Sequence, residues 1–241
     1  MRYGIFSDIH ANLEAFEAVL EAYKKEKIDR FVCLGDIVGY GVNPNECLKL
    51  VKNLNPVGIA GNHDWAVLDK ISPAYFNLFA KEAVIWTKKV LQEKAIRYLN
   101  NLSLIYQEND FSCVHGSLDN PEKFNYIIDS LDAENTFSLL KGRICFVGHS
   151  HKMESFCLNQ GRISFTKDYQ LNLQKEAKYI INTGSVGQPR DRDPRACFCV
   201  YDSQKGMISF RRVEYNIKKA ADKILKAGLP PLLAERLYLG R

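Results

Sequence analysis

The stretch Phe146-Val147-Gly148-His149-Ser150-His151-Lys152 places two of the chain's five histidines one residue apart, directly after an apolar run. The run over residues 144–148 predicts a buried β-strand, so the two imidazoles stand where a strand gives way to a loop. Gly148 carries no side chain and lets another group approach the backbone closely. In open α/β sheets the carboxyl ends of strands form the usual crevice for ligands. The stretch therefore predicts a ligand site at a strand end.

Four more polar residues stand in the same kind of position. Each follows a short apolar run: His10 after residues 2–7, Asp36 after 30–34, His63 after 56–60 and His115 after 110–114. A single histidine at a strand end is more often a hydrogen-bonded polar residue than a ligand. All five histidines of the chain lie at strand ends, beside Asp, Asn or Gly, and this joint pattern favours one shared site.

Short β-rich runs alternate with helical patterns, which predicts an α/β sheet protein. Helices are expected after Asn12, over residues 43–53, from about 65 to 101 and over 132–140. Further strands are expected at 104–107, 154–158, 162–166, 178–182, 196–202 and 207–213. A last helix over 216–227 is expected to end at Gly228 and the Pro230-Pro231 pair. Without a repeat or linker, residues 1–241 are expected to form a single domain.

The composition narrows the class of protein. The 241 residues are 46% hydrophobic and 25% charged, as in ordinary globular proteins. The formal charge of +5 is spread over scattered basic pairs, which argues against a nucleic-acid partner. Seven cysteines without a C-x-x-C pair favour a reducing compartment. Since no signal peptide or membrane-spanning run is apparent, a cytoplasmic protein is expected.

The donor types indicate a transition-metal site. Carboxylate, imidazole and amide groups without thiolate suit Mn, Fe, Zn, Co or Ni. In an extended chain, alternate side chains point to the same side. The D-x-H pair of Asp8 and His10 and the H-x-H pair of His149 and His151 are therefore expected to lie on extended backbone and to face one metal cluster.

The motifs D-x-H, G-D, G-N-H-D, V-H-G and G-H-x-H, in this order between Asp8 and His151, resemble the motif set of the calcineurin-like metallophosphoesterases. The segment NTGSVGQPRD at 182–191 resembles their bacterial and archaeal phosphodiesterase-like branch. The resemblance implies a four-layer αββα sandwich, with two packed mixed sheets flanked by helices. It also implies a metal-dependent phosphoesterase in which a hydroxide bridging two metal ions attacks phosphorus.

The resemblance also implies residue roles. One divalent ion would be held by Asp8, His10, Asp36 and His151, and a second by Asp36, Asn62, His115 and His149. Manganese is expected first, with Fe, Zn, Co or Ni as alternatives. His63 resembles the family's catalytic histidine, which acts as an acid toward the leaving group. Whether the adjacent Asp64 orients this histidine is left open.

One departure from the family pattern bears on the substrate. The segment GDIVGYG at 35–41 lacks the arginine that the protein phosphatases and symmetrical dinucleoside tetraphosphatases carry there. A small phosphodiester is therefore expected as substrate. Arg190 and Asn12 are the candidate substrate contacts, although the loop at 187–195 could equally be an exposed turn of paired Arg and Asp residues. Tyr40 could line a pocket or pack in the core.

Other functions of the same fold stay open at this point. A phosphomonoesterase or protein phosphatase, a nuclease and a non-catalytic scaffold share these motifs in part. The intact donor positions argue against the scaffold, and the missing basic stripe argues against the nuclease. The oligomeric state is not predicted.

Overall fold

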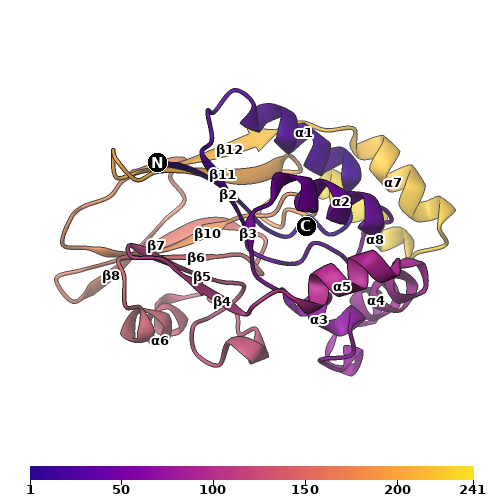
Figure 1. Ribbon diagram of the computed structural model, residues 1–241, viewed down its shortest axis with the longest axis horizontal. Helices are drawn as coiled ribbons and strands as arrows, with labels where there is room; N and C mark the ends of the chain where they lie inside the picture. The colour runs from indigo at the N-terminus through magenta and orange to yellow at the C-terminus, as the bar shows by residue number, and fades with distance from the viewer.

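The computed structural model describes residues 1–241 and contains two six-stranded sheets packed face to face (Figure 1). The first sheet has the order β3 (Val57–Gly58), β2 (Arg30–Cys33), β1 (Arg2–Phe6), β11 (Ala196–Asp202), β12 (Met207–Val213) and β9 (Gln170–Asn172). The second has the order β4 (Ile105–Gln107), β5 (Phe111–Val114), β6 (Ile144–Val147), β10 (Lys178–Thr183), β7 (Met153–Asn159) and β8 (Arg162–Thr166). The expected pair of mixed sheets is confirmed.

Each sheet contains three neighbouring parallel strands. In the first sheet they are β3, β2 and β1, and in the second they are β5, β6 and β10. Strands that run parallel end at the same edge of their sheet. The loops that carry the expected donor residues therefore leave each sheet side by side.

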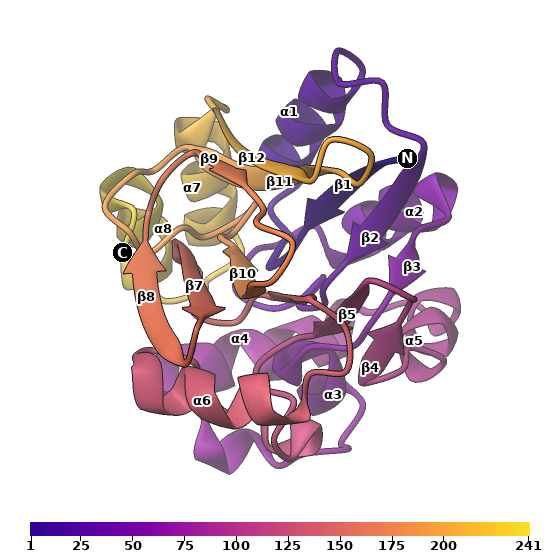
Figure 2. The same cartoon turned by 90° about the vertical axis from the view of Figure 1, so that its left-hand side faces the viewer.

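Eight helices surround the two sheets, and two of them, the first and the sixth, each cover one outer face. The eight helices are α1 (Leu13–Tyr23), α2 (Pro44–Leu54), α3 (Asn62–Val67), α4 (Leu78–Val90), α5 (Glu93–Asn100), α6 (Ser130–Leu139), α7 (Ile217–Lys226) and α8 (Pro231–Leu239). Figure 2 shows α1 against the first sheet and α6 against the second, one on each outer side. No helix combines the length and the apolar character needed to cross a membrane.

Alternation along the strands separates the core layers. On β1, Tyr3 and Ile5 point between the sheets, whereas Phe6 packs toward α1 against Phe16. The ring of Tyr3 meets the ring of Phe111 on the opposite sheet edge-on, with centroids 5.1 Å apart. Burying one such side chain contributes about 1.5–3 kcal/mol, so this interior layer fixes how the sheets sit on each other.

Three features differ from the sequence prediction or refine it. The helical pattern from 65 to 101 is divided among α3, α4 and α5, because Pro73 follows an extended residue and a short 3₁₀ turn, η1 (Pro73–Tyr75), separates α3 from α4. The helix over 216–227 is not the last one. Pro231 begins α8, where the missing N–H of proline costs nothing. The short strand β9 lies at a sheet edge and was not predicted.

Candidate metal centre

Ends of strands from both sheets bring the expected donors together. Asp8 and His10 follow β1, Asp36 follows β2, Asn62 and His63 begin α3 after β3, His115 follows β5, and His149 and His151 follow β6. All eight residues are buried. The site is therefore made where the two sheets meet, and neither sheet supplies it alone.

The donor atoms form two groups that share one residue. Asp8, His10, Asp36 and His151 make the first group, and Asp36, His115 and His149 the second, with the donor atoms within each group lying within 4.8 Å of one another. Asp36 Oδ2 lies 3.5 Å from His10 Nε2 and 3.3 Å from His115 Nε2. The Oδ1 atom of Asn62 is also buried. Its side chain lines the same cavity as Asp36 and His149. This arrangement can accommodate two cations with Asp36 between them.

The backbone at these residues differs from the expectation of an extended chain. β1 ends at Phe6 and β6 ends at Val147, before the donor pairs. The φ angles are 55° at Asp8, 48° at His10, 66° at His149 and 60° at His151. Such left-handed backbone costs on the order of 1–3 kcal/mol for each residue that carries a side chain. Tight loops, and not strand alternation, turn both members of each pair toward the centre.

Two glycines make room for the carboxylates. A Cβ atom at Gly61 would collide with Asp36 Oδ1, and one at Gly148 would collide with Ser7 Oγ and crowd Asp8 Oδ2. The two aspartates therefore lie directly against backbone, which holds them in one position.

Backbone carbonyl groups orient the imidazoles of His10 and His151. His10 Nδ1 lies 3.0 Å from Val38 O, and His151 Nδ1 lies 2.6 Å from Gln188 O. These contacts require Nδ1–H to donate, so the Nε2 lone pair of each ring points into the site. The two Nε2 atoms are 3.0 Å apart. Two lone pairs at this distance repel each other unless a cation or proton lies between them.

Several buried donor atoms lack a hydrogen-bond partner. They are Asp8 Oδ1, Asn62 Oδ1 and His115 Nε2. A buried polar atom left in this way costs about 1–3 kcal/mol. Coordination to a cation would remove this cost at all three atoms together. The nitrogen and oxygen donor set thus fits divalent metal ions.

The charge states of the donor residues also suit the binding of metal ions. Burial lowers the pKa of His10 and of His149 well below the ordinary value, so both are neutral at pH 7. Burial opposes ionisation of Asp36, but the neighbouring imidazoles, His115 first, hold its pKa below the usual range. Burial also lowers the pKa of His115, but the Asp36 carboxylate outweighs it and raises that pKa to about 9. A proton and a metal ion therefore compete for His115 Nε2.

His63 lies beside the donors and is not one of them. Its backbone N–H donates to Asp36 Oδ1 at 2.8 Å. Its ring is held by three aromatic neighbours, with centroid distances of 4.6 Å to Tyr40, 4.8 Å to His10 and 4.8 Å to Phe76. Burial lowers the pKa of His63 to about 4. Packing, and not an acidic partner, orients this imidazole.

The carboxylate of Asp64 accepts hydrogen bonds from backbone N–H groups and does not orient His63. Its Oδ1 accepts hydrogen bonds from the backbone N–H groups of Ile37 at 3.0 Å and Val38 at 3.3 Å. Its Oδ2 accepts one from Gly61 N at 3.1 Å. The question left open by the sequence is answered: Asp64 ties the loop after β2 to the start of α3.

An open cavity lies over the donors. Its volume is about 200 Å³, and its polar wall includes Asp36, His63 and Arg190. Next to it lies a groove of about 590 Å³ with a more apolar wall. The cavity and the groove share Asn62, Tyr75, Phe76, Tyr126 and His149. A molecule bound at the donors can therefore extend into the groove.

The loop at 187–195 places its charged side chains in two different ways. Asp193 pairs with Arg195 at 2.7 Å, and Asp191 pairs with Arg212. Arg190 instead lines the cavity and donates to Tyr40 Oη at 3.2 Å.

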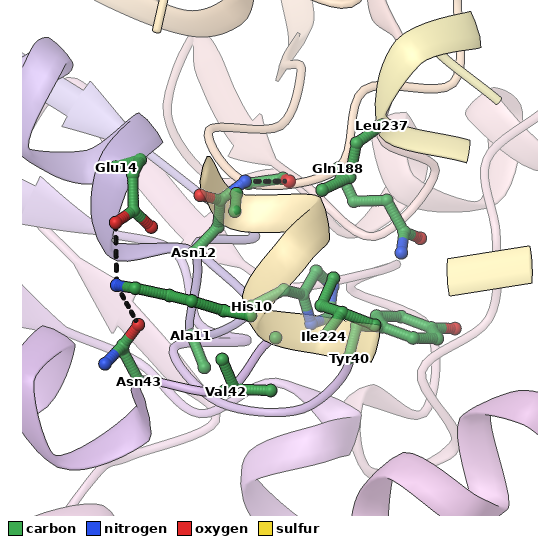
Figure 3. A pocket seen from close by; sticks show the side chains of 14 residues that line it. His10, Ala11, Asn12, Glu14, Tyr40, Val42, Asn43, Gln188, Ile224 and Leu237 are labelled. Atoms are coloured by element: carbon green, nitrogen blue, oxygen red, sulfur yellow. Dashed lines mark hydrogen bonds and ion pairs between the residues drawn. The ribbon is translucent and has the colours of Figure 1, made fainter. Parts of the chain in front are cut away.

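Asn12, the second candidate substrate contact, forms two hydrogen bonds within the protein. Its amide donates to Gly187 O at 2.8 Å and accepts from Ala15 N at 3.2 Å at the start of α1. Figure 3 shows it in a separate small cavity behind His10, with a volume of about 10 Å³. Both polar groups of its side chain are used within the protein.

Sequence reasoning missed two residues near the cavity. The ring of Tyr126 stacks on His149 with centroids 3.9 Å apart and planes 14° from parallel. Arg236 belongs to α8, and its guanidinium carbon lies 5.9 Å from the centre of the Tyr40 ring. Neither residue stands in a motif, and both are placed by tertiary packing alone.

Residues 1–206 match the family model of the calcineurin-like phosphoesterase superfamily domain. The chain belongs to this superfamily. It is 43% identical over 250 residues to the protein MJ0912 of Methanocaldococcus jannaschii, covering 99% of this chain and 98% of that protein. A crystal structure of a metallophosphoesterase from Sphaerobacter thermophilus superposes with a TM-score of 0.87 at 38% identity, over 100% of this chain and 99% of the other.

A second solved structure supports the fold alone. PH1004 from Pyrococcus horikoshii OT3 is 22% identical with a TM-score of 0.82, over 100% of this chain and 98% of that chain.

Membership of the calcineurin-like superfamily makes the chain a metal-dependent phosphoesterase, and this expectation is confirmed. The Asp and His clusters fit divalent metal ions.

Proposed function

We propose that residues 1–241 act as one catalytic domain that hydrolyses small phosphodiesters in the cytoplasm with two divalent cations. The observation that carries the diester assignment is the continuity of cavity and groove through Tyr126 and His149. A diester has a second ester group that needs space beside the scissile phosphate, whereas a monoester does not. The groove, walled by Tyr75, Phe76 and Phe124, suits an aromatic or apolar second group.

The two donor groups assign the ligands. Asp8, His10, Asp36 and His151 would hold one cation, and Asp36, Asn62, His115 and His149 the other. When bound, such a pair of cations neutralises charge on the phosphate oxygens and lowers the pKa of water at the site. Nitrogen and oxygen donors without thiolate suit Mn, Fe, Zn, Co or Ni, and manganese is the first candidate to test.

The protein's own residues would position the ester and supply a proton. His63 Nδ1 is buried against Gly39, which leaves Nε2 as the ring nitrogen available to a substrate in the cavity. His63 would act as the acid in its protonated form, which a bound phosphate anion favours, and the proton at Nε2 would pass to the leaving oxygen, a contribution of typically 10²–10⁴-fold. Arg190, which lines the same cavity, would bind the phosphate oxygens through its guanidinium.

A pair of aryl substrates tests the diester assignment. With Mn-loaded protein at neutral pH, we expect kcat/KM for bis(p-nitrophenyl) phosphate to exceed that for p-nitrophenyl phosphate by about tenfold. Tyr126→Ala should raise KM for the diester more than for the monoester, because it removes the wall between cavity and groove. Tyr169→Ala is the matched control, since Tyr169 is 49% exposed and Tyr126 is 46% exposed. A clear preference for the monoester would contradict the assignment.

A further inference from the structure

Two arginines stand over one tyrosine at the edge of the cavity. The guanidinium carbon of Arg190 lies 5.6 Å from the centre of the Tyr40 ring, and that of Arg236 lies 5.9 Å from it. Arg190 comes from the loop after β10, and Arg236 comes from α8. The Tyr40 ring itself lies 4.6 Å from His63 and 4.7 Å from His10. The arginine pair is therefore one aromatic ring away from the metal centre.

No side-chain carboxylate pairs with either arginine. Arg190 donates to Tyr40 Oη at 3.2 Å and to Gln188 Oε1 at 2.9 Å, while its Nε is buried without a partner. Arg236 donates through Nε to the backbone oxygen of Arg241 at 2.8 Å. The guanidinium groups of the pair are therefore not matched by acidic side chains.

Two neighbouring arginines, in contrast, have carboxylate partners. Arg195 pairs with Asp193 at 2.7 Å, and Arg212 pairs with Asp191. The two acidic side chains of the loop are therefore paired with other arginines and not with Arg190. Arg195 and Arg212 thus each have a carboxylate partner, whereas no acidic side chain pairs with Arg190 or Arg236.

The two cations also act on each other. Burial, and then the positive charge of Arg190, lower the pKa of Arg236 from its ordinary value. Two like charges in a partly desolvated place repel, and an anion between them would relieve the repulsion. Guanidinium groups present fork-shaped donors that match the oxygens of a phosphate.

We propose that Arg236 is the specific contact of a subsite for a second phosphate of the substrate, with Arg190 shared between this phosphate and the scissile one. The preferred substrates are then phosphodiesters that carry a further phosphate group on one of their ester arms. The inference rests on the proposed function for the scissile phosphate and deepens it. Arg236 lies outside residues 1–206, the part that matches the superfamily model, so membership of the superfamily does not by itself supply this subsite.

One alternative use of the same residues makes a different prediction. If both arginines contacted the scissile phosphate, removing either would weaken the binding of ligands with one phosphate and of ligands with two. The unmodified protein would then favour the monoester, whose dianion gains most from two cations. A second-phosphate subsite instead affects only ligands with two phosphates. The two cases are separated by ligands that differ in that group alone.

The kinetic test uses two nitrophenyl esters. The p-nitrophenyl ester of thymidine 5′-phosphate is compared with the same ester bearing a 3′-phosphate, on Mn-loaded protein. We expect the 3′-phosphate to raise kcat/KM by about tenfold, the value of one or two charge-assisted hydrogen bonds. Arg236→Gln should abolish this advantage and leave the simpler ester within about twofold, and Arg236→Lys should retain part of it. Lys226→Gln, which removes an exposed charge from α7, is the control for net charge.

A binding test decides the subsite independently of turnover. Calorimetric titration of the Mn-loaded protein with thymidine 3′,5′-bisphosphate and thymidine 5′-phosphate should give a higher affinity for the bisphosphate. Arg236→Gln should weaken only the bisphosphate, by about tenfold. Equal affinities in the unmodified protein, or equal weakening of both ligands by the variant, would overturn the inference. If neither ester is hydrolysed while the calorimetric difference is present, the proposed function fails and the subsite stands.

Discussion

The carboxylate of Asp36 contacts residues of both donor groups and the backbone of His63. Its Oδ2 faces His10 and His115, one from each donor group, while its Oδ1 accepts the backbone N–H of His63 at 2.8 Å. Its backbone is left-handed, with a φ of 52°, and Gly61 leaves it room. One side chain therefore joins the two cation positions and also positions the expected acid.

Replacement of His63 separates proton transfer from metal binding. His63→Gln keeps a neutral side chain of similar size, and it should lower kcat by about 10²-fold for a poor leaving group. The loss should be smaller for p-nitrophenolate, which needs little protonation. Rates for alkyl and nitrophenyl esters of the same phosphate measure the difference. Equal losses for both esters would remove His63 from the role of acid.

At the scale of elements, an ion pair joins the helices behind the metal centre. Glu14 on α1 lies 2.6 Å from Lys223 Nζ and 3.1 Å from Lys219 Nζ on α7. Lys223 also donates to Asn43 Oδ1, at the start of α2, at 2.8 Å. Three helices are thus held together beside the loop that carries His10.

Loss of this ion pair should appear in the acid stability. Burial raises the pKa of Glu14, but hydrogen bonds from Lys223 and Lys219 outweigh it and lower the pKa from 4.5. Its contribution is therefore complete above about pH 4.5 and is lost as pH falls through the lower folded value.

Glu14→Gln should reduce the free energy of unfolding at pH 7 by about 1–2 kcal/mol, a figure discounted because Lys219 is 57% exposed. The deficit should shrink below pH 4. Urea unfolding at pH 7 and pH 3.5 measures it, with Glu17→Gln, an exposed position of α1, as control. An equal deficit at both pH values would contradict the ion-pair account.

The sequence predicted elements whose pattern is local and missed those that depend on packing. The strands at 196–202 and 207–213 are right because alternating and apolar runs mark them. The last helix, α8, was missed because Pro230-Pro231 is typical of a helix end, although proline also suits a helix start. The donors were predicted because each follows a strand. Arg236 could not be, since only the packing of α8 brings it to Tyr40.

At the scale of the whole molecule, the site depends on the contact between the sheets. The first sheet supplies Asp8, His10, Asp36 and Asn62, and the second supplies His115, His149 and His151. The rings of Tyr3 and Phe111 hold the two layers in register. Cations bound across this contact favour the folded over the unfolded chain, so metal binding and folding are coupled.

The central claim is a pair of cations that share Asp36, and metal stoichiometry tests it most directly. The protein is loaded with Mn, freed of excess metal by gel filtration and analysed by inductively coupled plasma mass spectrometry. We expect two ions per chain in the unmodified protein and in His63→Gln, and loss of metal from both positions in Asp36→Asn. One ion or none per chain in the unmodified protein would contradict the account.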